Sequence, residues 1–356
     1  MTRPDSGDIP SLNGLRAVSI GFVLLAHGIG FSQDHSFTFR LFLLHGNLGV
    51  RIFFVISGFL ITTLLLKERL KLGSICLKLF YVRRFLRILP PFVLFAIALV
   101  VLQTLGYLYI PGLLWAHILT YTVNFTSGVW STDHLWSLSV EEQFYLLWPL
   151  ALRFVRLGTC AWIAIGSVFA GILIRGLDSI TGIQLVNPDL RLAFPFVAGP
   201  IATGCLLAMA APQVRDFILR HPNWFGSVAL FAATMIVLLL DTFEFGKAAQ
   251  FVELPKDVLL TLCVARFVFL PIGLVAAVLN SAPAVFIGKL SYSLYLWQQL
   301  FLNPFSDALI CRFPLNLCAA FAVAWLSYTL VEKRFFALRK RFRREPVAIA
   351  AVAGAG

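Results

Sequence analysis

Apolar residues fill most of this chain in long stretches that short polar segments separate. A helix needs about 20 apolar residues to cross the hydrocarbon core of a bilayer. By that measure the pattern predicts ten membrane-spanning helices, at 12–31, 47–66, 89–109, 138–154, 159–176, 191–211, 223–241, 257–280, 284–303 and 313–334. The apolar segment Leu113 to Phe125 is short for a span, which favours a re-entrant or interfacial helix. We therefore expect an all-α integral membrane protein in which one bundle occupies residues 12–336.

Composition and charge support this class and give the bundle an orientation. The chain is 59% hydrophobic and 13% charged, whereas a soluble domain carries about twice that charged fraction. The net charge is +12, and 21 of the 29 Lys and Arg residues fall in segments that are inside when the N-terminus is inside. This bias predicts an even number of spans, with both termini cytoplasmic, in a multi-pass protein of the inner (plasma) membrane.

The two end segments are expected to be short cytoplasmic extensions. Residues 1–11 precede the first span, which has an arginine-bearing flank and no small-residue cleavage site, so we expect it to be retained. Residues 337–356 are basic and then Ala/Gly-rich, which favours contact with the anionic inner leaflet over nucleic-acid binding. The six cysteines form no CxxC pair, so buried thiols are expected rather than a metal site or a disulfide framework.

The first span carries two ionisable residues, Arg16 and His27. Eleven residues separate them, which is close to three helical turns, so both side chains project from one face about 16 Å apart. An ionisable group at this depth is expected to face the protein interior or a wet cavity. Histidine suits general-base chemistry, while the alternatives are a packing hydrogen bond for His27 and simple snorkelling for Arg16.

A second basic segment precedes the third span. The run Tyr81 to Pro91 holds Arg83, Arg84 and Arg87 at spacings that cluster on a helix. The pair Pro90–Pro91 is expected to mark the start of the span. The arginines are either a positive-inside anchor or a binding site for a phosphate-bearing ligand at the cytoplasmic face.

The segment His134 to Pro149 places Glu141 and Glu142 next to each other in an otherwise apolar helix. One acid in the first turn would complement the helix dipole, but two acids followed by Gln143 are less well explained in this way. A carboxylate here would either orient the imidazole of His27 or bind substrate hydroxyls.

Three further segments are less distinctive. Phe53 to Leu65 contains a Ser-Gly pair, which favours a close helix–helix contact. Ile287 to Gln299 is rich in Ser, Tyr and Gln, so its polar groups, Tyr292 among them, either line a cavity or anchor the helix at an interface. In Ser327 to Phe335 we expect Glu332 to form an end-of-helix ion pair with Lys333 or Arg334.

Taken in order, these segments resemble the membrane acyltransferase-3 family of bacterial O-acyltransferases. The resemblance rests on SLNGLRAVSIGFVLLAH, FFVISGFLIT, RRFLRILPP, HLWSLSVEEQFYLLWP, IGKLSYSLYLWQ and YTLVEKRF. It implies a ten-helix bundle that moves an acyl group, usually acetyl from acetyl-CoA, to a hydroxyl of a saccharide or glycolipid. It also implies that His27 and Arg16 are essential, that Arg84 to Arg87 is the inner-loop arginine motif, and that Glu141 lies on the Ser-Val-Glu element. Many members have histidine after SLYLW where this chain has Gln298, so no proton-carrying role is expected at that position.

The resulting hypothesis makes His27 the general base and Arg16 and Glu141 its catalytic partners. Arg83, Arg84 and Arg87 would hold the nucleotide end of the acyl-CoA, and Glu142 and Tyr292 would contact the acceptor, with no metal involved. A proton-coupled transporter or flippase that uses His27, Arg16 and Glu141 as a relay is the alternative, and a non-catalytic scaffold is a third. The sequence leaves open the acceptor, the acyl chain length, the side of transfer and the oligomeric state.

Overall fold

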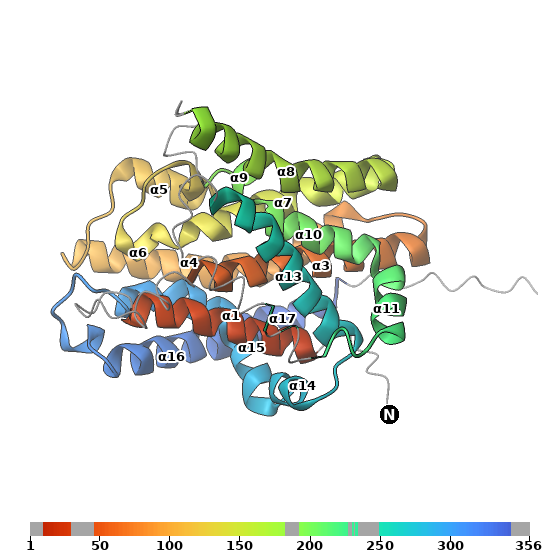
Figure 1. The fold of residues 1–356 in the computed structure, drawn as a ribbon. Helices are drawn as coiled ribbons and strands as arrows, with labels where there is room; N and C mark the ends of the chain where they lie inside the picture. Colours follow the sequence, from red (N-terminus) through yellow and green to blue (C-terminus); the bar gives the residue numbers. More distant parts are fainter. Residues whose placement is uncertain are drawn as a thin grey trace, which may run out of the picture.

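Long helices, most of them roughly aligned, make up the computed structural model (Figure 1), which describes residues 10–29, 46–181, 192–226, 230, 232–233 and 249–342. The described residues contain helices and connections and no strand. The longer elements are α1 (Pro10–Ile29), α3 (Gly46–Leu72), α4 (Leu77–Thr104), α7 (Leu135–Phe154), α8 (Leu157–Thr181), α10 (Gly199–Met209), α11 (Ala211–Arg220), α13 (Ala249–Phe269), α15 (Ala282–Phe301) and α16 (Leu315–Ser327). The shorter ones are α5 (Gly112–Leu119), η1 (Val123–Phe125), α6 (Trp130–Asp133), α9 (Phe194–Val197), α14 (Leu274–Leu279), η4 (Leu309–Cys311), η5 (Tyr328–Glu332) and α17 (Lys333–Lys340).

The all-helical membrane class is confirmed. Within the described part, four helices are long and apolar enough to cross a bilayer: Asn47–Leu72, Leu77–Thr104, Leu157–Ile174 and Leu315–Arg339. On α4, apolar side chains such as Val93 and Ile97 are exposed, as expected of a surface that faces lipid. The count of ten spans and the placement of the termini stay predictions, and most of the span predicted at 223–241 lies outside the described residues.

One predicted span is not a continuous helix. The span predicted at 257–280 is interrupted, because α13 ends at Phe269 and α14 begins only at Leu274. Between them Gly273 has a φ of +89°, a left-handed conformation that suits glycine and turns the chain.

The region around residues 113–125 forms the short helices α5 and η1, in line with the expectation that it does not span.

The proline pair Pro90–Pro91 lies inside α4 and does not begin the helix, so the predicted start of the third span is wrong. Residues 67–88 lie between two predicted spans, but they are mostly helical, since α3 continues to Leu72 and α4 starts at Leu77. Lys, Arg, Glu and Leu are good helix formers, so a helix can continue past the apolar segment that crosses the membrane. Arg83, Arg84 and Arg87 consequently belong to the same continuous helix as the third span.

Small residues let the central helices approach each other closely. α10 packs against α3, and α1 lies between α3 and α15. A Cβ added at Gly58 of α3 would lie 2.0 Å from the carbonyl oxygen of Ile201 on α10, and one at Gly204 of α10 would lie 2.2 Å from that of Val55. The close helix contact predicted from the Ser-Gly pair is therefore confirmed, and Ser57 is left beside it on the interior of the bundle.

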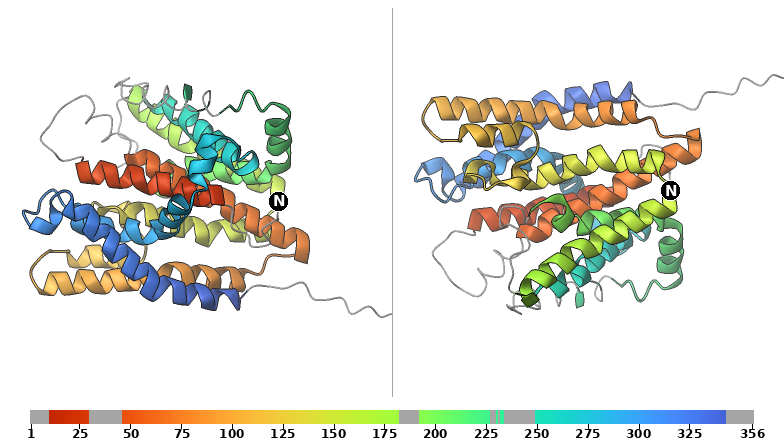
Figure 2. Two further views of the ribbon diagram at one scale, coloured as in Figure 1. Left: turned by 90° about the horizontal axis from the view of Figure 1, so that it is seen from below. Right: turned by 90° about the horizontal axis from the view of Figure 1, so that it is seen from above.

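The bundle has two distinguishable ends (Figure 2). The connection between α3 and α4 lies at the end where α17 finishes, while α5 and α6 lie at the opposite end. We call these the inner end and the outer end, after the orientation that the charge distribution predicts. α1 begins at the inner end, so Arg16 lies in its inner half and His27 near its outer terminus.

Candidate active site

His27 lies near the outer terminus of α1, where helix α15 and the short helix α6 meet it. Its side chain is half-buried. Its Nδ1 atom lies 2.8 Å from Oε1 of Gln298 on α15, whose side chain is fully buried. The indole of Trp130 on α6 packs edge-on against the imidazole, with ring centroids 5.5 Å apart. Gln298, and not Glu141, is thus the hydrogen-bond partner of His27, so the idea that Glu141 orients this imidazole is wrong.

A second histidine, which the sequence analysis had not singled out, lies close to the first. Nδ1 of His134 is 2.5 Å from Oε1 of Gln299, and the same oxygen accepts the backbone N–H of His134 at 3.1 Å. His134 is 3% exposed and interacts electrostatically with His27. The sequence feature that could have pointed to His134 is the pair of consecutive glutamines in an apolar helix. Gln298 bonds the imidazole of His27, and Gln299 bonds that of His134. We call His27, His134, Gln298 and Gln299 the histidine cluster.

The inner half of the bundle brings together three arginines and three glutamates from four helical segments. They come from α1, α4, α7 and the π-helical turn η5, and we call them the arginine–glutamate cluster: Arg16, Arg84, Arg87, Glu141, Glu142 and Glu332. The charge of Arg16 interacts with those of Arg84, Arg87 and Glu141, and the charge of Glu332 with those of Arg16 and Arg87. Three positive and three negative groups offset one another, which lowers the cost of keeping charges inside a membrane protein.

Glu141 is held in place by two hydroxyl groups. Ser57 on α3 donates a hydrogen bond to its Oε1 at 2.8 Å, and the hydroxyl of Tyr145 lies 3.2 Å from its Oε2. Tyr145 also lies 3.0 Å from Ser57, which closes a triangle of three polar groups. The guanidinium of Arg84 stacks over the Tyr145 ring at 4.5 Å from the centroid. These contacts fix the carboxylate of Glu141 next to the cationic groups.

Among the residues that the structure describes, the three arginines of the cluster make no direct ion pair. In the described part of the chain, no carboxylate oxygen lies within 4.0 Å of the guanidinium nitrogens of Arg16, Arg84 or Arg87. The Nε atom of Arg16 is buried without a hydrogen-bond partner there, and so is Oε1 of Glu142. Buried polar atoms are nearly always satisfied in native proteins, so unpartnered ones point to a ligand or ordered water. The arrangement fits an anionic ligand, because guanidinium groups bind phosphate oxygens in pairs.

Two other predicted site residues have different surroundings. Arg83 faces away from the cluster, because its guanidinium pairs with Glu68 at 3.3 Å and donates to the carbonyl of Phe342 at 3.0 Å. Tyr292 on α15 lies next to the cluster, since its hydroxyl donates at 3.0 Å to the carbonyl of Ile88, the residue after Arg87. The structure thus brings Arg84 and Arg87, but not Arg83, together with Arg16.

Glu332 belongs to the arginine–glutamate cluster, a role that the sequence did not predict, and its predicted ion pair with Lys333 or Arg334 is wrong. Its side chain is 2% exposed and accepts a hydrogen bond from Ser293 on α15. The cause is local: residues Tyr328–Glu332 form a π-helical turn, which adds a residue to the turn and rotates the following positions. Such turns occur frequently at functional sites. The sequence feature that could have pointed to a buried role for Glu332 is a Glu in an otherwise apolar segment.

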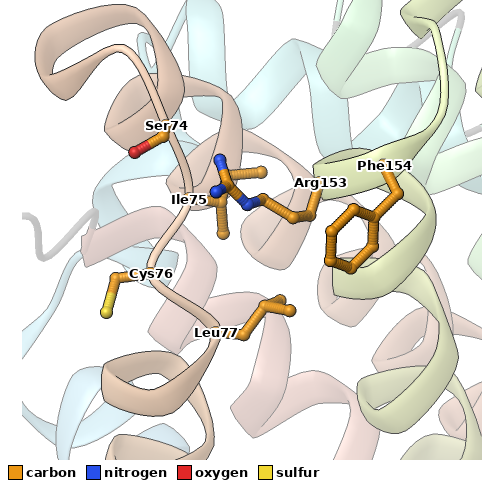
Figure 3. A pocket seen from close by; sticks show the side chains of 6 residues that line it. All are labelled: Ser74, Ile75, Cys76, Leu77, Arg153 and Phe154. Atoms are coloured by element: carbon orange, nitrogen blue, oxygen red, sulfur yellow. The ribbon is translucent and has the colours of Figure 1, made fainter.

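A cavity of about 470 Å³ opens at the inner end, apart from both clusters. It is lined by Ser74, Ile75, Cys76, Leu77, Arg153 and Phe154, and Arg153 reaches from the end of α7 toward the α3–α4 connection (Figure 3). None of the predicted site residues lines it. No group of three or more His, Cys, Asp or Glu side chains suited to a metal ion occurs among the described residues.

The fold and these two clusters define a polytopic helical membrane protein with a polar interior site. Comparison with known families identifies it further, because residues 9–332 match a family described as an acyltransferase domain. The chain belongs to this family of acyltransferases. No solved structure is significantly similar to it.

Curated relatives agree with this assignment. A Staphylococcus aureus protein with the name "Putative O-acetyltransferase" is 30% identical over 319 residues, which cover 82% of this chain and 50% of that protein. The peptidoglycan O-acetyltransferase OatA of Listeria monocytogenes is 26% identical over 93% of this chain and 56% of its own length. The O-acetyltransferase OatA of Staphylococcus aureus is 27% identical over 91% and 56%. The chain thus spans about half the length of the curated relatives it matches.

Proposed function

We propose that the protein is an O-acetyltransferase of the inner (plasma) membrane that moves an acetyl group from acetyl-CoA to a hydroxyl of a saccharide acceptor. Membership of the acyltransferase family supports the reaction class. The name of the Listeria monocytogenes relative, a peptidoglycan O-acetyltransferase, supports a cell-envelope saccharide or glycolipid as the acceptor.

One observation carries the proposal. Helix α1 carries His27 near its outer terminus and Arg16 in its inner half. Arg16 belongs to a group of three arginines that make no ion pair among the described residues. Arg16 and His27 are eleven residues apart, which corresponds to about 16 Å along a helix. An extended donor with an anionic nucleotide at one end and a reactive thioester at the other matches this separation of a cationic site from a basic group.

In the proposed reaction His27 acts as the general base. Its Nε2 atom takes the proton from the acceptor hydroxyl while the hydroxyl oxygen forms a bond to the carbonyl carbon of the thioester. The carbon–sulfur bond then breaks, and the imidazolium returns the proton to the departing thiolate. The products are the acetyl ester and free CoA thiol, so His27 ends in its initial state.

The other residues bind and orient the reactants. Arg84 and Arg87, together with Arg16, would hold the phosphates of the donor. Glu141, fixed by Ser57 and Tyr145, would keep Arg16 in place through its charge. Glu142 and Tyr292 would contact the acceptor, since Glu142 retains an unpartnered buried oxygen within the described part of the chain.

The test follows thiol release from acetyl-CoA by purified protein in nanodiscs, with and without a mixed pool of saccharide acceptors. His27→Ala should abolish acceptor-dependent release, because general-base catalysis contributes about 10²–10⁴-fold. The matched control is His117→Ala, since His117 on α5 bonds Thr122 at 2.9 Å and belongs to neither cluster. Near-normal release by the folded His27→Ala protein would reject the general-base role. Failure of the wild type to bind acetyl-CoA at all would favour the transporter alternative.

A further inference from the structure

The amide of Gln298 lies where it determines which ring nitrogen of His27 carries the proton. Its side chain is 0% exposed, and Oε1 lies 2.8 Å from Nδ1 of His27. A neutral imidazole has one N–H donor and one acceptor nitrogen, and a partner at one nitrogen selects the tautomer. Nε2 of His27 has no hydrogen-bond partner among the described residues.

We propose that Gln298 is the positioning residue of His27: it accepts the Nδ1 proton and so leaves Nε2 as the basic atom. This inference rests on the proposed function, in which His27 is the base.

The orientation of the amide agrees with a base that gains and loses a proton in each turnover. When His27 takes up a proton, both ring nitrogens become donors. The amide oxygen can accept from Nδ1 in the neutral and in the cationic state, so the bond persists through the reaction. With the amide reversed, its NH₂ group would face an N–H in the cationic state and the contact would become repulsive. The oxygen-facing orientation is the one present.

A neutral amide also differs in its effect from the carboxylate found in many catalytic histidine pairs. An aspartate beside an imidazole fixes the tautomer and stabilises the imidazolium at the same time. Glutamine fixes the tautomer but adds no countercharge, so the imidazolium gives its proton to the leaving thiolate more readily. This predicts that replacing the amide with a carboxylate changes the pH dependence of the reaction and not only its rate.

The surroundings of His27 define what else contributes to that pH dependence. Among the described residues, the titratable or charged groups on elements packed around the outer half of α1 are His134, Asp133, Tyr295, Cys318 and the network of Arg51, Glu253, Lys256 and Asp257. Arg51 pairs with Glu253 and Asp257, so these charges largely offset one another. His134 interacts electrostatically with His27, and its own partner is Gln299. Gln299→Leu, one residue further along the same helix, therefore provides a comparison that removes the acceptor of the second imidazole and keeps that of His27.

The experiment measures kcat, KM for acetyl-CoA and the pH profile of kcat/KM for the wild type, Gln298→Leu, Gln298→Glu and Gln299→Leu. Gln298→Leu removes the acceptor, and we expect kcat to fall about 10²-fold, near the lower limit of a general-base contribution, while KM stays within about twofold. Gln298→Glu keeps the acceptor and adds a charge that favours the imidazolium. It should retain more activity than Gln298→Leu and move the acid limb of the profile to higher pH by about one unit.

The outcomes separate this inference from the proposed function. If His27→Ala is inactive but both Gln298 variants keep the wild-type kcat and pH profile, Gln298 does not position His27 and only this inference fails. An equal loss of kcat in Gln299→Leu, with no pH shift in Gln298→Glu, would reduce Gln298 to a structural role and would also overturn it. If His27→Ala remains active, the proposed function itself fails. Should Gln298→Leu not fold, the pH profile of Gln298→Glu, which keeps the shape of the side chain, decides alone.

Discussion

At the scale of single residues, the most unusual feature is a set of buried cationic groups that have no direct ionic partner in the described part of the chain. Arg16, Arg84 and Arg87 repel one another, and within the described residues their carboxylate neighbours lie beyond ion-pair distance. A purely structural site would gain stability by closing these pairs, because removing charges from water costs several kcal/mol per ion unless they are well paired. The open arrangement is expected of a site that completes its contacts with an anionic ligand.

The arginine–glutamate cluster gives a prediction that distinguishes ligand binding by its arginines from a purely structural role. Arg84→Gln and Arg87→Gln should each raise KM for acetyl-CoA about 10- to 100-fold, since a hydrogen bond to a charged group contributes about 1.5–3 kcal/mol. Arg83→Gln is the control, because Arg83 already pairs with Glu68 and with the carbonyl of Phe342. It should change KM less than about threefold. Steady-state kinetics of thiol release at several donor concentrations measure all three, and equal effects at Arg83 and Arg84 would contradict this view of the cluster.

The sequence predicts which site residues lie close together where their positions follow from helical spacing. Arg16 and His27 share a face because eleven residues make about three turns, and Arg84 and Arg87 lie one turn apart. It does not predict the roles of Gln298, His134 and Glu332, because these roles depend on which helix lies opposite. Gln298 and Gln299 are equivalent in sequence, yet one contacts α1 and the other contacts the start of α7. Only the packing of the bundle distinguishes them.

At the scale of elements, the observed helices differ from the predicted spans in two ways. α4 runs through the proline pair at which a helix was expected to start, and the span predicted at 257–280 is interrupted between α13 and α14. The proline pair lies inside α4, because neighbouring helices can satisfy the backbone groups that proline frees in a membrane bundle. The hydroxyl of Tyr292 on α15 donates to the carbonyl of Ile88 just before the pair, so α15 contacts the backbone of α4 at this point. The π-helical turn before Lys333 carries no clear sequence signature.

The contact between α3 and α10 gives a prediction about stability. A methyl group at Gly58 would lie 2.0 Å from a backbone oxygen of α10, so Gly58→Ala forces the two helices apart. Overpacking of this kind costs about 1–3 kcal/mol and should lower the Tm of the protein in detergent. It should also lower activity, because Ser57 on the same turn holds Glu141.

The control for this prediction is Gly166→Ala on α8, where an added methyl group would meet nothing within 4 Å. Its Tm should stay the same or rise slightly, since alanine is the better helix former. A lower Tm for Gly166→Ala than for Gly58→Ala would show that the helix contact is not the cause.

At the scale of the whole molecule, the two clusters lie in different halves of the bundle and α1 connects them. In the proposed function the nucleotide of the donor binds at the arginine–glutamate cluster and the chemistry takes place at the histidine cluster. Such a division requires the inner end, with the α3–α4 connection, to face the compartment that supplies acetyl-CoA. The positive charge of the predicted inner segments points the same way.

The orientation can be tested directly with a membrane-impermeant maleimide. Cys76 lies in the α3–α4 connection, lines the cavity there and is half-buried, whereas Ser127 is exposed near the outer end between η1 and α6. In a chain without the other five cysteines, Cys76 should react in inverted vesicles and stay unlabelled in intact spheroplasts. With Cys76 also replaced, Ser127→Cys should show the opposite pattern. Labelling of both positions from the same side would contradict the predicted topology. Labelling with the sides exchanged would place the arginine–glutamate cluster away from cytoplasmic acetyl-CoA and would therefore remove the basis for the proposed donor.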